Sequence, residues 1–192
     1  MDLHHNHKRP DFAAPIAVFL SSPTTECESE FLAACQRSGS LHHPWVATLD
    51  SPARYAEYLE RIRCGRTIAF LVRRTSDNQL AGVINVSEPV MGIFQSAYLG
   101  FYAFAGSERR GYMTIALSLV LDRAFKELGF HRLEANIQPD NVASASLVKR
   151  LGFRKEGFSP RYLFIDGAWR DHDRWALLAE EWATQRSLIL KD

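Results

Sequence analysis

The chain has 192 residues, of which 46% are hydrophobic and 23% are charged, and its formal net charge is +1. These values are typical of one folded globular domain, and they exclude a disordered, collagenous or coiled-coil chain. They also argue against a general nucleic-acid binder, which would carry a basic excess. The three cysteines, Cys27, Cys35 and Cys64, form no CxxC pair, so we expect a reducing, cytoplasmic location.

The polar start of the chain, residues 1–14, is predicted to be a mobile tail that precedes a single domain over residues 15–192. Met1–Arg9 is polar, and the apolar run Ala13–Leu20 has only eight residues with a proline among them, so we expect no signal peptide. A membrane span needs about 20 apolar residues, so we expect no membrane association. The tail histidines lack the further ligands that a metal site needs, and no metal is expected.

Hydrophobic periodicity predicts the first half of the domain as two helices followed by an antiparallel meander. Pro52 at the first position of the second helix is typical of a helix start. The predicted segments are a strand Ile16–Leu20, a helix from Thr24 or Thr25 to about Arg37, a loop Leu41–Trp45, a helix from Ser51-Pro52 to about Arg63, and strands Thr67–Arg73, Leu80–Ser87 and Ala97–Phe104.

The second half changes to alternating helices and strands. A wide apolar face over Met113–Leu128 predicts a helix packed on a sheet, and Gly129 ends it. The remaining predicted segments are a strand Arg132–Gln138, a helix from Asp140 or Asn141 to Leu151, a hairpin of Tyr162–Ile165 and Ala168–Leu177 joined by Asp166-Gly167, and a short helix Ala179–Ser187. The order predicts an α/β (α+β) sandwich with helices on both faces of a central sheet.

Two motifs stand out as candidates for chemistry. Glu108-Arg109-Arg110-Gly111-Tyr112-Met113 precedes the long helix, where free backbone N–H groups, two arginines and a glycine favour an anion site. An ordinary strand-to-helix turn with solvated charges is the equal alternative. Asn141 and Ser144 meet at the start of the next helix, where capping alone would explain both residues.

Together these motifs resemble the GCN5-related N-acetyltransferase (GNAT) superfamily. The resemblance rests on RRGYM opening a long helix, on RLEANI, and on PDNVASASLVKRLGF. GFSPRYLFIDGAWRDH and the Leu41–Trp45 loop are similar to the RimJ/RimL branch, the ribosomal-protein-alanine N-acetyltransferases. The resemblance covers about residues 16–178. It implies a mixed, mostly antiparallel sheet of about seven strands, flanked by helices and splayed between the fourth and fifth strands.

The resemblance also implies acetyl-CoA as the cosubstrate and assigns residues to it. The backbone of the loop and helix start would cradle the pyrophosphate, the strand before it would pair with the pantetheine arm, Asn141 would bind that arm, and Ser144 would lie near the sulfur. The cofactor-binding residues on this basis are Phe101, Tyr102, Phe104, Arg109, Arg110, Gly111, Tyr112, Met113, Thr114, Asn141 and Ser144.

Three positions depart from the family pattern. Glu108 stands where Gln or Arg is frequent, and we expect its carboxylate to point away from the phosphates. Met113 stands where Gly or Ala is usual. Val148 replaces a tyrosine acid of many relatives, so Ser144 or a water must protonate the thiolate instead.

The acceptor amine must attack as a neutral nucleophile. An α-amine, with a pKa of about 7.7–8.0, needs only a weak base, whereas lysine is almost wholly protonated near neutral pH. Glu134 is the candidate general base, and the alternative is that it is an outward-facing strand carboxylate without a catalytic role. His172 is a second candidate base. Trp45 and Asp171 are candidate acceptor-binding residues, with core packing of Trp45 and a solvated strand carboxylate as alternatives.

The function expected from the resemblance is N-acetylation of a protein N-terminal α-amine of the RimJ type, with a ribosomal protein as one candidate acceptor. The alternatives are a small-amine or antibiotic acetyltransferase on the same fold, and a CoA-binding regulatory module without turnover. The expected partner is a protein or peptide N-terminus, with no nucleic acid, and the expected state is a monomer or homodimer.

Overall fold

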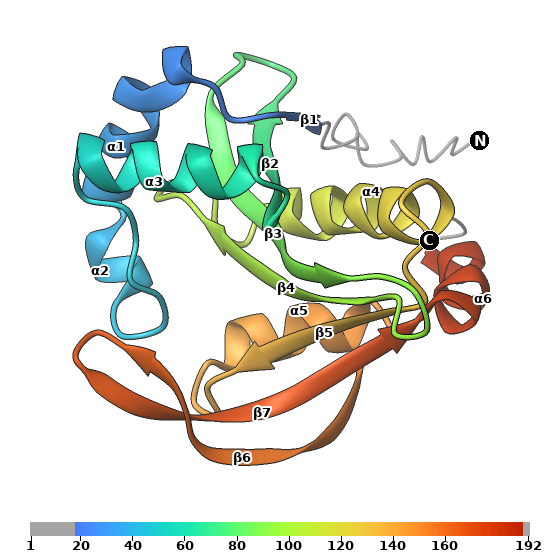
Figure 1. Ribbon diagram of the computed structural model, residues 1–192. Helices are drawn as coiled ribbons and strands as arrows, with labels where there is room; N and C mark the ends of the chain where they lie inside the picture. The colour runs from blue at the N-terminus through green and yellow to red at the C-terminus, as the bar shows by residue number, and fades with distance from the viewer. Residues whose placement is uncertain (1–17, 190–192) are drawn as a thin grey trace, which may run out of the picture.

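A seven-stranded sheet with helices on both faces organises the chain (Figure 1). The computed structural model describes residues 18–189. The strands are β1 (Val18–Ser21), β2 (Thr67–Arg74), β3 (Leu80–Val90), β4 (Ser96–Ala103), β5 (Arg132–Ile137), β6 (Arg154–Ile165) and β7 (Ala168–Leu178). The helices are α1 (Glu28–Arg37), α2 (Gly39–His42), α3 (Pro52–Arg63), α4 (Tyr112–Lys126), α5 (Val142–Arg150) and α6 (Ala179–Ile189), with a 3-10 turn η1 (Thr25–Cys27) before α1.

The strand order is β1-β2-β3-β4-β5-β7-β6. Neighbouring strands pair antiparallel throughout, except for β4 and β5, which run parallel. A parallel pair needs a crossover connection, and α4 supplies it. The mixed, mostly antiparallel sheet expected from the sequence is confirmed.

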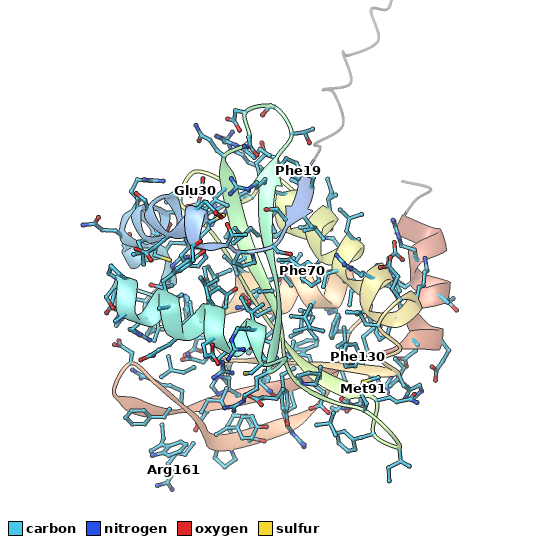
Figure 2. All side chains as sticks on the ribbon, turned by 45° about the horizontal axis from the view of Figure 1, so that its top comes forward. Phe19, Glu30, Phe70, Met91, Phe130 and Arg161 are labelled. Atoms are coloured by element: carbon cyan, nitrogen blue, oxygen red, sulfur yellow. The ribbon has the colours of Figure 1, made fainter. Side chains whose placement is uncertain are left out.

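Two apolar layers enclose the sheet. On one face, α4, α5 and α6 bury a large core around Leu117, Leu121, Leu133 and Trp182, and Phe70, labelled in Figure 2, lies in the same core. On the other face, α1 and α3 cover a smaller, aromatic core. Its rings are those of Phe31, Tyr55, Tyr58 and Phe104. Strands β2, β3 and β4 are therefore covered on both faces.

The β4–β5 pair is short. Only Ser96–Tyr98 pairs with Arg132–Glu134, and beyond these residues the two strands diverge. β4 stays paired with β3, and β5 stays paired with β7, along their remaining lengths. The expected splay between the fourth and fifth strands is confirmed.

Three local predictions differ from the structure. β6 begins at Arg154 rather than at Tyr162, because two irregularities in its pairing with β7 remove the period-2 pattern that marks a strand. A one-turn helix, α2, occupies the start of the predicted loop, and a 3-10 turn precedes α1. The predicted tail, with its histidines, and the predicted strand's first residues lie outside the described part of the chain.

Candidate active site

Two helix N-termini meet at one edge of the sheet. Because β4 and β5 run parallel, their carboxyl ends lie at the same edge, and α4 and α5 begin just beyond those ends (Figure 1). Both helices pack on the same face. A helix N-terminus carries partial positive charge and unpaired N–H groups, so the edge where the strands diverge favours an anion and hydrogen-bond acceptors.

The loop before α4 presents its backbone donors. Arg109 and Gly111 have φ angles of 57° and 79°, in the left-handed region. The first bond of the helix runs from the Ile115 N–H to the Gly111 carbonyl, at 3.2 Å. Within the described part of the chain, no acceptor meets the N–H groups of residues 109–114. Such a run of free N–H groups at a turn forms an anion-binding nest.

The Glu108 carboxylate does not compete with an anion for the free N–H groups of this nest. Its Oε2 accepts the Gly106 N–H at 2.6 Å, which draws the side chain back to the start of the loop. Arg109 and Arg110 are exposed. The loop therefore combines free backbone donors with two cationic side chains.

The diverging edge of β4 keeps free backbone groups. The Phe104 N–H binds the Ala81 carbonyl on β3 at 2.9 Å, so alternation directs the N–H and C=O of Phe101 and Ala103 away from β3, toward β5. The Ala103 carbonyl accepts from His42 Nε2 at 2.7 Å.

The side chains of this segment have structural roles. Phe104 is buried in the aromatic core, Tyr102 packs against His42 with ring centroids 4.8 Å apart, and Phe101 packs toward α4. Burial lowers the pKa of His42 and raises that of Tyr102. The side chains of these residues are therefore engaged in packing, and only their backbone is available for the predicted cofactor contact.

Asn141 caps α5 and retains a donor. Its Oδ1 accepts the Ser144 N–H at 3.1 Å, as a helix cap does. Its Nδ2 has no partner among the described residues. Ser144 is half-buried in the first turn of the same helix. The structure thus shows the capping role and leaves the Asn141 amide donor free beside the diverging strands.

Met113 is accommodated by a glycine on β3. A Cβ added at Gly82 would lie 2.5 Å from the Met113 sulfur and 2.6 Å from the Tyr102 carbonyl oxygen. Met113 is buried in the α4 core, while its N–H belongs to the free nest. The missing side chain at position 82 thus explains how a large residue fits where the resemblance predicts a small one.

Glu134 lies on the sheet face opposite α4 and α5. Its neighbours Leu133 and Ala135 are buried in the α4 core, so alternation places Glu134 and Asn136 on the other face. The Glu134 Oε1 accepts from Arg132 Nε at 2.8 Å, and Oε2 has no partner among the described residues. Asn136 Oδ1 is also buried without a partner there. Glu134 therefore shares this face with a guanidinium that binds it and with a buried amide oxygen that has no partner among the described residues.

Tyr98 stands beside Glu134 at the last residue pair before the strands diverge. Its side chain is 42% exposed. The pKa of Tyr98 is raised first by a hydrogen bond with Tyr162, then by partial burial, and also by the charge of Glu134. Sequence reasoning missed both tyrosines, because only the assembled sheet brings β4 and β6 side chains together.

The loop after α2 closes over the end of β5. Gln138 Nε2 donates to the carbonyl oxygens of Pro44 and Trp45 at 3.1 and 3.3 Å. His43 Nδ1 lies 2.9 Å from Asp166 Oδ2 in the β6–β7 turn, and both side chains are exposed. The half-buried Trp45 is therefore held between β5 and the hairpin, on the Glu134 side of the sheet.

Asp171 and His172 lie on opposite faces of β7. Asp171 Oδ1 accepts the Arg161 N–H at 2.7 Å, and Figure 2 shows Arg161 at the outer rim of the hairpin. By alternation Asp171 shares its face with Asp173, which is the face opposite Glu134, so the structure does not bring Asp171 and Glu134 together. The Asp173 carboxylate pairs with Lys155. His172 is buried on the Glu134 face, donates from Nδ1 to the Arg170 carbonyl at 2.9 Å, and has a pKa lowered by burial.

Between Val18 and Ile189 no helix is both long and apolar enough to cross a bilayer. In the same range, no three His, Cys, Asp or Glu side chains are grouped as metal ligands would be.

Comparison with known proteins places this geometry in a family. Residues 18–154 match the family model described as acetyltransferase (GNAT) domain. A probable N-acetyltransferase, YjcK, from Bacillus subtilis is 35% identical over 65% of this chain and 69% of that protein. A [ribosomal protein uS5]-alanine N-acetyltransferase from Escherichia coli is 38% identical over 57% of each chain, so the match spans little more than half of that relative.

Solved structures with a similar fold are also acetyltransferases. Mycobacterium smegmatis RimJ in complex with CoA-disulfide superposes with a TM-score of 0.80 and 26% identity, over 90% of this chain and 88% of that one. A spermidine N-acetyltransferase from Vibrio cholerae, in complex with CoA and spermine, has a TM-score of 0.75 over 86% and 98% of the chains, but its 18% identity shows the shared fold alone. The chain therefore belongs to the GNAT acetyltransferase family, in its RimJ-like branch, and is an enzyme.

Proposed function

We propose that this enzyme transfers an acetyl group from acetyl-CoA to the α-amine of a protein or peptide N-terminus, in a ternary complex. The observation that carries the proposal is the diverging β4–β5 pair, with free N–H groups on one side and free acceptors on the other. The similarity to a ribosomal-protein-alanine N-acetyltransferase supports a protein acceptor, and a ribosomal protein is one candidate.

The residues present fit acetyl-CoA. The free N–H groups of residues 109–114, with Arg109 and Arg110, would bind its pyrophosphate. The outward N–H and C=O of Phe101 and the outward N–H of Ala103 would pair with its amide groups, and Asn141 Nδ2 would donate to it. When bound, acetyl-CoA supplies an activated acyl thioester. An N–H of the same strand edge would stabilise the negative charge that develops on the carbonyl oxygen.

The acceptor amine would enter on the face of Glu134. An amine offers N–H donors, and Glu134 Oε2 and Asn136 Oδ1 are acceptors without partners on this face. At pH 7.5 about a third of an α-amine is neutral, against roughly a thousandth of a lysine side chain. We propose that Glu134 accepts the proton from the α-amine and that Arg132 holds the carboxylate in place. Ser144 or a water would protonate the departing thiolate.

Thiol release from acetyl-CoA tests the proposal. The panel contains peptides that begin with Ala, Ser or Met, the same peptides with blocked N-termini, spermidine and an aminoglycoside. Turnover is expected for free peptides and is lost on blocking. Turnover with spermidine or the aminoglycoside alone would establish the small-amine alternative, and binding of CoA without turnover on any acceptor would indicate a regulatory module.

The proposed setting is the cytoplasm. Cys27, Cys35 and Cys64 are all free thiols in the structure. Free cysteines are the usual state in a reducing compartment, which supports this location.

A further inference from the structure

The acceptor face carries two arginines without partners. Arg174 lies directly opposite Asn136 in the β5–β7 pairing, so both side chains project on the Glu134 face. Arg170 follows the same alternation on β7, with the buried His172 between them. Within residues 18–189, neither guanidinium meets a carboxylate or any other recorded acceptor. We call Arg170 and Arg174 the arginine pair.

Arg170 is half-buried and Arg174 is exposed, and each has a distinguishing local feature. Arg170 Nε is buried and has no hydrogen-bond partner, and an unpaired buried donor is unfavourable unless a ligand satisfies it. Arg174 lies over Gly157 of β6, where an added Cβ would come within 2.6 Å of its Nη2. The missing side chain at position 157 thus leaves the space that this guanidinium fills.

The nearby acids do not neutralise the pair. Glu134 and Glu156 both bind Arg132, and Glu156 also binds Arg154. Asp171 and Asp173 lie on the other face of β7 and have their own partners. The acceptor face beyond Glu134 therefore carries unbalanced positive charge, which disfavours a polyamine and favours an acceptor with a carboxylate near its amine.

The spacing indicates where that carboxylate lies. Arg174 is two residues along and one strand across from Glu134, and its guanidinium leans one strand further, over Gly157. With about 3.3 Å per residue and about 4.8 Å per strand, the separation is roughly 8–12 Å. An extended peptide covers this distance in about two to four residues.

We infer that the preferred acceptor is a peptide N-terminus with an acidic side chain about two to four residues behind the α-amine, that Arg174 binds this carboxylate, and that Arg170 adds positive charge to the same face. The inference rests on the proposed function and names its substrate class. Guanidinium and carboxylate form paired, charge-assisted hydrogen bonds, so the contact selects acid over amide at equal size.

A matched set of peptides tests the inference. Ala-starting peptides that differ only in Glu, Gln or Lys at position 3, with further sets at positions 4 and 5, are assayed with acetyl-CoA and the full chain. For at least one position we expect a kcat/KM about tenfold or more higher for Glu than for Gln, lower again for Lys, and a ratio that shrinks with added salt.

Variants assign the effect. Arg174→Gln is expected to bring the Glu-to-Gln ratio to within about threefold by raising KM for the Glu peptide, with kcat nearly unchanged. Gly157→Ala, which displaces the guanidinium but keeps its charge, is expected to give an intermediate ratio. Arg150→Gln removes one arginine from α5, on the other face, and should keep the wild-type ratio.

The outcomes separate the two proposals. Peptide turnover with no preference for Glu at any of the three positions, or a preference that survives in Arg174→Gln, overturns the arginine-pair inference and leaves the proposed function intact. Turnover of spermidine without turnover of any peptide overturns the proposed function, and the inference with it.

Discussion

Replacing Gly111 by alanine separates the cofactor role of the nest from its backbone strain. Gly111 has a φ of 79°, and an L-residue in the left-handed region costs about 1–2 kcal/mol. For a chain of this size, that loss lowers Tm by about 2–8 °C. A Cβ at this position also obstructs the close approach of phosphate to the backbone. Losing one hydrogen bond to a charged group, worth about 1.5–3 kcal/mol, weakens acetyl-CoA binding roughly tenfold to a hundredfold.

Gly65→Ala is the matched control. Gly65 has a φ of 76°, and an added Cβ there would meet no heavy atom within 4 Å. Both variants should lose similar stability in thermal unfolding, and calorimetric titration with acetyl-CoA should show weaker binding for Gly111→Ala alone. Equal affinities for acetyl-CoA in the two variants and the wild type would refute the placement of the pyrophosphate at this loop.

Four further predictions test the remaining assignments. Asn141→Ala should lose about 1 kcal/mol of stability with the cap, whereas Asn141→Asp should keep the cap; both should weaken acetyl-CoA binding, and unchanged affinity in Asp would reduce Asn141 to a structural role. Gly82→Ala should lower the unfolding free energy by about 1–3 kcal/mol through overpacking, and a neutral result in chemical denaturation would contradict the contacts around it. Glu134→Gln should reduce kcat/KM by about a hundredfold near pH 7, with partial recovery above about pH 8 as free amine accumulates, and a wild-type rate at pH 7 would remove it from the mechanism. Burial lowers the pKa values of His42 and His172, so their contribution to stability is fully present above about pH 6.5 and is lost as the pH falls toward and through the folded-state pKa values. The free energy of unfolding should fall by up to about 1.4 kcal/mol per pH unit for each histidine. Denaturation curves that do not change between pH 7 and 5 would contradict this.

Local signals in the sequence were sufficient for most helices and strands. Pro52 and Asn141 mark helix starts that the structure confirms, and Asp166-Gly167 marks the hairpin turn between β6 and β7. Each of these residues acts through its own backbone or its immediate neighbours. A single sequence therefore contains the information that these predictions need.

The acceptor face depends on contacts between distant segments. Tyr98 meets Tyr162, and Gln138 meets Trp45, only because the sheet brings β4, β5 and β6 beside the α2–α3 loop. The same holds for Gly82 on β3, whose close neighbours are Tyr102 and Ala103 on β4 and Met113 on α4. The start of β6 was missed for a different reason, since its irregular pairing with β7 leaves no alternation to detect.

The environment of Glu134 links the sheet's ion pairs to the proposed chemistry. Arg132 binds Glu134 through Oε1 alone and also binds Glu156, and these contacts raise the pKa of the guanidinium. A side chain fixed through one carboxylate oxygen leaves the other free, at the point where β4 and β5 separate. Arg132 thus orients the base without occupying it, because a guanidinium can only donate hydrogen bonds and does not compete for the amine proton. Two residues further along the same face, the strand pairing places Arg174 opposite Asn136, so one β5 segment aligns the amine end and the acidic end of the proposed acceptor.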